Sequence, residues 1–213
     1  MRDHIKIQLL KNILDEVTKR YDDVIEAQNK ALEEHFERAI KDPLTGLYNR
    51  YYLFDYARKS LQKLHREHKC AIVVFFDLDN FKYVNDHFGH KEGDRVLTEV
   101  AQILKSTFRS YDIVARLGGD EFAAYIESPI SQANDQEELE QLLTLLVQRI
   151  ETHFQTYQIS ASYGTAIFPR EGENLNELIE IADKRMYEKK RSKHTSRSSQ
   201  ILLTHNDQLS PSK

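Results

Sequence analysis

The chain has 213 residues, 34 acidic and 30 basic, with a formal net charge of −4 at pH 7. This length suits one compact domain plus an appended segment, and the charge excludes a global basic field of the kind that binds nucleic acid polymers. The single cysteine excludes an intrachain disulfide framework, and the longest apolar run is far shorter than the roughly 20 residues that cross a membrane. We therefore expect a soluble, cytoplasmic protein with no membrane span.

The N-terminal segment, residues 1–41, is expected to form a long helix, because residues 4–41 contain neither glycine nor proline. Pro43 ends it, since proline disfavours the helical conformation in the residue before it. A helix packed on its own domain is one interpretation, and a parallel dimerising helix is the preferred one. Apolar residues at every third or fourth position predict the coiled-coil seam: Ile7, Leu10, Leu14, Val17, Tyr21 and Val24.

Alternating helices and strands are expected in a domain over residues 42–205, followed by a disordered tail at 206–213. The order strand-helix-strand-strand-helix-strand predicts an α+β, ferredoxin-like fold, in which helices cover one face of a mostly antiparallel sheet. The expected elements are helix 49–67, strand 70–77, helix 81–87, helix 94–108, hairpin 111–127, helix 134–154, strand 158–167, helix 174–191 and a final strand near 199–204.

Two glycines and two carboxylates stand at the tip of the expected hairpin, in Gly118-Gly119-Asp120-Glu121-Phe122. Glycine adopts backbone conformations that other residues resist, and it lets a ligand approach closely. An acidic pair at such a turn can hold a divalent cation through hard oxygen ligands. An ordinary acidic turn is the alternative, because Gly and Asp are common in turns generally.

A second acidic pair stands at the end of a continuously apolar run, residues 70–76, in Asp77-Leu78-Asp79. A carboxylate at the end of a buried strand costs desolvation energy unless a cation or a donor compensates it. Two acidic clusters are better explained by a shared metal site than by a helix cap. Mg²⁺ is typically held by one or two carboxylates and substrate phosphates, so a nucleoside triphosphate is the expected ligand.

At these residues the chain resembles the GGDEF family, the diguanylate cyclases that make cyclic di-GMP from two GTP molecules. The resemblance covers residues 42–204 and implies a palm-type nucleotidyl cyclase fold. Five separated motifs carry it: residues 42–50, the segment 76–86, Phe88-Gly89-His90 with Gly93-Asp94, the Gly-Gly-Asp-Glu-Phe turn, and Ala182-Asp183 with Met186, Tyr187 and Lys190.

The resemblance implies nucleotidyl transfer, with Mg²⁺ or Mn²⁺ neutralising phosphate charge and lowering the pKa of the attacking hydroxyl. It assigns the metal to Asp77, the Leu78 carbonyl, Asp120 and Glu121. Asp120 is also the family's candidate general base, and Lys82 is expected to meet the triphosphate as a point charge.

The resemblance also implies a GTP-binding set: Phe81, Lys82, Asn85, His90, Asp94, Gly118, Gly119 and Lys190. Asn85 and Asp94 correspond to the guanine readers, because a carboxylate can accept from the N1–H and N2–H₂ edge. Asp94 would otherwise be the N-cap of the helix that it opens. Lys193-His194 stands where many relatives have Gly-Arg or Gly-Lys; a histidine there would bind phosphate more weakly and with pH dependence.

Arg109 and Asp112 match the RxxD pattern of the family's inhibitory product site, at the family's spacing from Gly118. An arginine fork suits phosphate and the guanine Hoogsteen edge, and an aspartate can accept from guanine nitrogens. An ion pair that closes a helix-to-strand connection is the alternative interpretation.

We thus expect a homodimeric diguanylate cyclase with feedback inhibition by cyclic di-GMP and a fused or upstream sensory domain. One alternative is a non-catalytic GGDEF module that only binds cyclic di-GMP or GTP as a receptor. Another is a related palm enzyme that makes a different cyclic nucleotide. The retained Asp77, Asp120 and Glu121 argue against the first, and Asn85 with Asp94 against the second.

Overall fold

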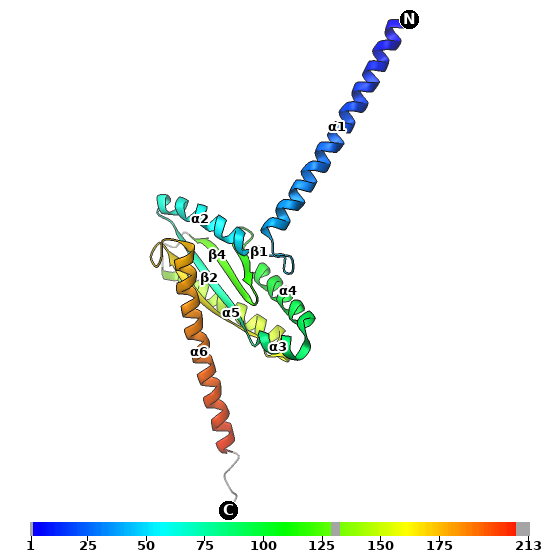
Figure 1. The fold of residues 1–213 in the computed structure, drawn as a ribbon. Helices are drawn as coiled ribbons and strands as arrows, with labels where there is room; N and C mark the ends of the chain where they lie inside the picture. The colour runs from blue at the N-terminus through cyan, green and yellow to red at the C-terminus, as the bar shows by residue number, and fades with distance from the viewer. Residues whose placement is uncertain (1, 129–132, 208–213) are drawn as a thin grey trace, which may run out of the picture. The chain divides into compact units, whose positions relative to one another are not determined.

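A computed structural model describes residues 2–128 and 133–207, and the chain divides into two compact units, residues 1–41 and 42–213. The first unit is α1, Arg2–Ile40, one uninterrupted helix (Figure 1). Its apolar seam is exposed, with Leu10 at 66% and Leu14 at 65% of full accessibility. A single helix cannot bury such a stripe by itself, and pairing with a second helix would bury it. A single chain does not test that pairing, so the coiled coil stays a prediction.

The second unit is built on a five-stranded sheet in the order β1-β3-β4-β2-β5. The apolar run at its centre is β2, which pairs antiparallel with β4 and with β5. The β3–β4 hairpin is also antiparallel, and the two-residue β1 adds to β3 in parallel. The bounds of the strands are β1 Tyr48–Asn49, β2 Cys70–Asp79, β3 Ile113–Gly118, β4 Glu121–Ser128 and β5 Ser160–Phe168.

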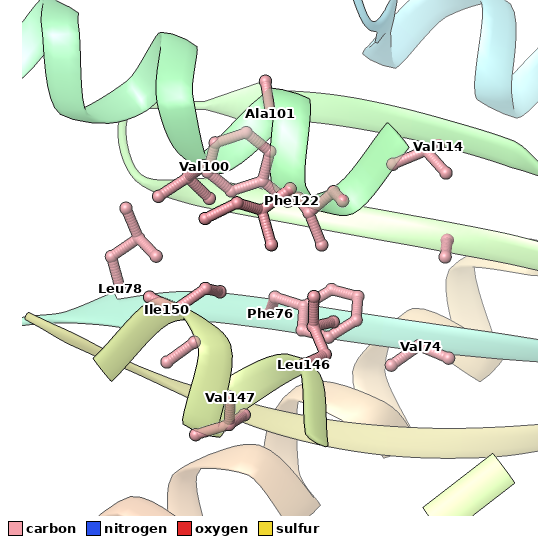
Figure 2. Packing of buried hydrophobic residues seen from close by; sticks show 14 of the residues in the cluster. Val74, Phe76, Leu78, Val100, Ala101, Val114, Phe122, Leu146, Val147 and Ile150 are labelled. Carbon is pink, nitrogen blue, oxygen red and sulfur yellow. The ribbon is translucent and has the colours of Figure 1, made fainter. Parts of the chain in front are cut away.

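Helices cover both faces of this sheet, because β2 is apolar at every position from Ala71 to Phe76 and buries both sets of alternating side chains. The even-numbered β2 residues pack with α4 and α5 in one core, where Figure 2 shows Val74, Phe76 and Leu78. The odd-numbered residues pack with α2 and α6 in the other. The helices are α2 Arg50–Glu67, α3 Phe81–Phe88, α4 His90–Thr107, α5 Ala133–His153, the 3₁₀ turn η1 Gln155–Tyr157 and α6 Leu175–Asp207.

The strand order and alternation confirm the α+β, ferredoxin-like fold, but the expectation that helices cover only one face is wrong. Helix α2 precedes the strand-helix-strand repeat and lies with α6 on the second face. Both helices carry an apolar stripe, and a continuously apolar central strand needs a partner on each side.

Two expected boundaries are also wrong. Helix α4 begins at His90 rather than Asp94, because Gly89 (φ 84°) separates it from α3 and its carbonyl accepts from the Gly93 amide at 3.2 Å. Asp94 therefore lies inside the helix and does not cap it. The final strand near 199–204 is helical: α6 contains neither glycine nor proline and continues to Asp207. The expected tail thus starts inside α6, and its residues 208–213 lie outside the described part of the chain.

Glycine allows α6 to lie directly on β5. A Cβ at Gly164 would come within 1.9 Å of the Ala182 carbonyl oxygen and 2.6 Å of the Met186 amide nitrogen. Both are backbone atoms, so the helix can approach this closely only because residue 164 has no side chain. The close approach places the next turn of α6, which carries Lys190, over the end of β2.

We expect Gly164→Ala to lower the free energy of unfolding by about 3 kcal/mol, because the helix must move away from the sheet. Urea unfolding of the variant and the parent chain measures this loss. Gly172→Ala is the matched control, since a Cβ there would meet only side-chain atoms, the nearest at 3.1 Å. Equal stability losses for the two variants would contradict the assigned packing.

Candidate functional site

Carboxylates gather where β2 ends. Asp77 and Asp79 are two residues apart on one strand, so both point to the face that α6 covers. Asp77 stands opposite Glu121, the first residue of β4, in the β2–β4 register. The Leu78 amide donates to the Asp120 carbonyl at 3.3 Å and joins the strand end to the hairpin tip. The two predicted acidic clusters therefore meet at one end of the sheet.

The hairpin tip depends on two glycines and one arginine. Gly118 (φ 152°) and Gly119 (φ 50°) adopt positive φ, which residues with a side chain rarely do. Arg116 donates through Nε and Nη2 to the Gly119 carbonyl at 3.0 and 2.8 Å. Its Nη1 donates to both carboxylate oxygens of Asp42, at 3.2 and 3.3 Å. Arg116 therefore fixes the backbone conformation that presents Asp120.

Asp42 is held for this contact by its own loop. Its Oδ1 accepts from the Thr45 amide at 2.9 Å and from the Thr45 hydroxyl at 2.7 Å. Burial alone would raise the pKa of Asp42, but the bonds from Thr45 and the charge of Arg116 outweigh it and lower the pKa. Asp42 is therefore ionised at neutral pH and orients the arginine by charge.

Lys190 brings a positive charge from α6 to the end of β2. Its ammonium bonds Asp77 and lies 3.2 Å from Asp79 Oδ1. Asp79 is buried and accepts from the Ser162 hydroxyl through both oxygens, at 3.1 and 2.9 Å. Ser162 lies beside Asp77 in the β2–β5 register, so three elements hold this ion-pair cluster.

The cluster is short of positive charge. Burial raises the pKa of Asp77, the Lys190 ammonium opposes the shift, and the carboxylates of Asp120 and Asp79 add to it. The pKa of Glu121 is raised by burial and then by Asp77 and Asp120. Burial would lower the pKa of Lys190, but bonds to Asp77 and Asp79 raise it overall. One ammonium among several carboxylates stays charged without neutralising them all.

This imbalance fits a divalent cation. Carboxylate and backbone carbonyl oxygens are the ligands that Mg²⁺ prefers, and a cation would relieve the raised pKa values of Asp77 and Glu121. Within residues 2–128 and 133–207, no group of three His, Cys, Asp or Glu side chains is placed to hold a metal by itself. The donor set therefore fits a metal that takes further ligands from the backbone and from a bound phosphate.

The predicted substrate residues lie on the helices that follow β2. Lys82 is exposed in the first turn of α3, and His90 is exposed as the first residue of α4. Asn85 is half-buried on α3 and Asp94 is exposed on α4. Phe81 is instead buried at 8% exposure in the core that α4 shares. It thus supports the α3–α4 pair from beneath.

Arg109 and Asp112 lie at the other end of β3 from the hairpin tip. Six residues of strand, Ile113–Gly118, separate them from it, roughly 20 Å of extended chain. Asp112 Oδ2 accepts from the Arg109 backbone amide at 2.9 Å, whereas the Arg109 guanidinium donates to the Tyr111 hydroxyl at 2.6 Å. Asp112 thus closes the connection through the backbone, and the guanidinium is exposed.

Asp112 also has an unsatisfied acceptor. Its side chain is buried at 7% exposure, and Oδ1 makes no hydrogen bond within the described residues. Burial raises the pKa of Asp112, although the bond from Arg109 opposes the shift. A buried acceptor without a donor is costly, and a ligand donor would relieve that cost.

Sequence reasoning assigned no role to several residues of this site. Ser162 and Arg116 act through contacts with residues 83 and 74 positions away in the chain, which no local pattern reveals. Asp79 belongs to the motif at residues 76–86, but only the structure shows that it holds Lys190. Asp183 of α6 raises the pKa of Glu121 through its charge, and Arg50 of α2 opposes it.

Comparison with known proteins gives a family match. Residues 39–196 match the sequence model of the family described as "Diguanylate cyclase, GGDEF domain". The bifunctional diguanylate cyclase/cyclic di-GMP phosphodiesterase MucR of Pseudomonas aeruginosa is 37% identical over 191 residues, which cover 87% of this chain and 27% of MucR. The diguanylate cyclase DgcS of Shewanella oneidensis is 35% identical over 162 residues, covering 75% and 52%. The chain thus spans between a quarter and about half the length of these relatives.

Solved structures give the same match. The coiled coil and GGDEF domain of DgcB from Caulobacter crescentus, in complex with c-di-GMP, has a TM-score of 0.71 and 25% identity, covering 84% of this chain and 95% of that one. The diguanylate cyclase SiaD of Pseudomonas aeruginosa, in complex with its activator SiaC, has a TM-score of 0.62 and 30% identity, covering 90% and 72%. None of the helices described in this chain is long and apolar enough to cross a membrane.

We expect Glu121→Gln to stabilise the fold relative to the parent chain at pH 7 but not at pH 4. The pKa of Glu121 is raised above its ordinary value of 4.5 in the folded state. At a pH above 4.5, ionising this carboxyl therefore costs more free energy in the folded state than in the unfolded state. The stability contributed by the protonated group is therefore lost as the pH rises, and glutamine removes that loss. Urea unfolding at both pH values, with divalent cations chelated, measures the difference.

Glu67→Gln is the matched control for this measurement. Glu67 is exposed at the end of α2, and a bond from Lys69 lowers its pKa. Its substitution should give no gain at pH 7. A Glu121→Gln variant that loses stability on going from pH 4 to pH 7, relative to the parent chain, would rule out the charge imbalance.

Proposed function

Because the chain belongs to the GGDEF domain family of diguanylate cyclases, we propose that it condenses two GTP molecules into cyclic di-GMP and releases two pyrophosphates. The observation that carries this proposal is the carboxylate cluster of Asp77, Asp120 and Glu121 at the end of the sheet, with the Lys190 ammonium beside it. A nucleotidyl transfer needs this combination, because negative charge develops on phosphate next to an attacking hydroxyl.

The metal would be held by Asp77, Asp120, Glu121 and the Leu78 carbonyl. Mg²⁺ or Mn²⁺ supplies neutralisation of phosphate charge and a lower pKa for the attacking 3′-hydroxyl. The hairpin tip orients Asp120, and Arg116 keeps that tip in place through Gly119. Asp120 is also the candidate general base. The ammonium groups of Lys82 and Lys190 meet the triphosphate, and Lys190 is already charged at the site.

Guanine would be read by Asn85 and Asp94, while Phe81 supports the helix pair and His90 begins the second helix. A carboxylate accepts from the N1–H and N2–H₂ groups, and an amide pairs with the remaining edge. Adenine lacks that donor pair, so ATP would leave these polar groups unpaired. GTP is therefore the proposed substrate.

A homodimer follows from the reaction, because the product joins two nucleotides bound one to each protomer. The exposed seam of α1 is the proposed dimerising surface, and it would set the effective concentration of the two half-sites. In the related structure, DgcB carries a coiled coil with its GGDEF domain. A sensory domain, fused or upstream, is the proposed source of the signal.

Cyclic di-GMP is proposed to bind at Arg109 and Asp112 as a feedback inhibitor. The exposed Arg109 guanidinium suits phosphate or a guanine edge, and the unsatisfied Asp112 Oδ1 suits a guanine N–H donor. The site lies at the far end of β3 from the carboxylates. The bound product would therefore inhibit by preventing two GGDEF domains from bringing their GTP sites together, and not by occupying the GTP site.

Incubation of the chain with GTP and Mg²⁺ should give cyclic di-GMP and two pyrophosphates per product, resolved by chromatography. We expect Asp120→Asn to lower kcat/KM by at least about 100-fold, because several kcal/mol of charge stabilisation depend on the metal. Glu67→Gln, at the opposite end of the sheet, is the control and should turn over normally. Tight cyclic di-GMP binding without any product would indicate a receptor instead.

We expect Arg109→Ala to raise the cyclic di-GMP concentration needed for half-maximal inhibition by about tenfold or more, since charge-assisted bonds to the product are lost. Steady-state turnover with added product measures this. Arg149→Ala removes another exposed arginine, from α5, and should leave inhibition as in the parent chain. Unchanged inhibition in the Arg109 variant would refute the product site.

A further inference from the structure

The short turn η1 contacts both of the helices that carry the proposed guanine readers, although the residues that it contacts lie more than 60 positions earlier in the chain. Tyr157, its last residue, donates from its hydroxyl to Glu92 Oε1 at 2.5 Å and accepts from Arg95 Nη2 at 3.1 Å. Its ring meets Phe88 edge-to-face with centroids 5.1 Å apart. Tyr157 thus touches the last residue of α3 and the first two turns of α4.

Charge strengthens the contact on α4. Arg95 donates to Glu92 at 2.5 and 3.0 Å and to Glu99 at 2.6 Å, and these bonds hold its guanidinium beside the tyrosine. The Arg95 guanidinium also lies 5.9 Å from the centroid of the Tyr157 ring. The bonds from Arg95 and then from Tyr157 lower the pKa of Glu92, so the acceptor is ionised at neutral pH.

The residue after η1 holds the start of α3. Asn80, which precedes α3, donates from Nδ2 to the Gln158 carbonyl at 2.8 Å. Asn80 and Gln158 both have a positive φ, 67° and 53°, a backbone conformation that residues other than glycine rarely adopt. The single loop 155–158 therefore contacts α3 at its beginning and, through Tyr157, at its end.

The α3–α4 spacing controls Asn85 and Asp94 directly. A Cβ at Gly93 would come within 2.1 Å of Asn85 Oδ1, so the Asn85 amide rests against the α4 backbone one residue before Asp94. A small displacement of α4 would therefore change the position of one reader against the other. Binding groups must be held to well under an ångström to discriminate between bases.

We propose that Tyr157 is a positioning residue for guanine recognition: it fastens α4 to α3 so that Asn85 and Asp94 face one base at the correct separation. The proposal rests on the proposed function, because it takes these two residues as the guanine readers. The tyrosine touches no substrate and acts through Glu92, Arg95 and Phe88. Because the Arg95 and Glu92 side chains are 48% and 24% exposed, their bonds add little to stability.

The test compares GTP with ITP, which lacks the 2-amino group, in Tyr157→Phe. This variant keeps the ring contact with Phe88 and removes the hydroxyl. We expect the ratio of kcat/KM for GTP to that for ITP to fall about threefold to tenfold, the worth of one hydrogen bond. The fall should come from a higher KM for GTP, with kcat for each nucleotide unchanged within about twofold. Equilibrium binding of the two nucleotides, measured in parallel, should show the same fall without requiring turnover.

Tyr56→Phe is the matched control, because its hydroxyl also donates to a carboxylate, that of Glu127 at 3.0 Å, but on the other face of the sheet. It should keep the parent ratio. Asn80→Gly is the second test variant, since glycine keeps the positive φ and removes the donor to Gln158. It should lower the ratio in the same direction, and it serves if Tyr157→Phe does not fold.

The outcomes separate this inference from the proposed function. A parent chain that makes no cyclic di-GMP contradicts the proposed function, and the binding ratio then still tests the positioning role. A parent chain that prefers GTP, with Tyr157→Phe and Asn80→Gly keeping the same preference in turnover and binding, overturns the positioning role. Loss of thermal stability without loss of base preference would likewise assign Tyr157 to the fold alone.

Discussion

Uncompensated negative charge at the end of the central strand is the constraint around which the second unit is built. β2 is buried on both faces, and it delivers Asp77 and Asp79 to a place where solvent cannot fully stabilise them. Lys190 of α6 partly compensates this charge by bonding Asp77. It reaches the site because Gly164 lets α6 lie directly on the backbone of β5. One ammonium does not balance the charge, and this deficit supports the proposed binding of a divalent cation together with a phosphate.

The tip of the β3–β4 hairpin is held by hydrogen bonds and charge rather than by packing. The tip must place Asp120 next to the strand end without a core to hold it, because both glycines are exposed. Arg116 supplies the missing rigidity through two bonds to one carbonyl, and Asp42 holds Arg116 by charge. The strand end is therefore positioned by packing and the turn by a partly buried ion pair. Breaking either partner of such a pair would leave the other uncompensated.

Most of the fold could be predicted from local patterns. The unbroken apolar run predicted β2, the Gly118-Gly119 pair predicted the hairpin, and periodic apolar residues predicted the helices. The errors have a common cause: the final strand near 199–204 and the start of α4 at Asp94 were placed without identifying what ends or begins each helix, and helix boundaries depend on that. Gly89 begins α4 four residues earlier, and nothing in α6 stops it before Asp207. The second helical layer was missed because α2 precedes the recognised repeat.

In the candidate site, too, local patterns indicated some residues and missed others. Asp77, Asp120 and Lys190 could be proposed as site residues because they match family motifs, but the residues that hold them in place could not. Ser162, Arg116 and Tyr157 each act on a partner more than 50 positions away, through one hydroxyl or one guanidinium. Such contacts leave no periodicity in the sequence. They also act on different parts of the site: Ser162 holds Asp79 and Arg116 holds the hairpin tip, whereas Tyr157 joins α3 to α4. In the proposed reaction, charge at the strand end would promote transfer from any nucleotide. The choice of base would then come from the helix pair, and its accuracy would depend on what holds that pair together.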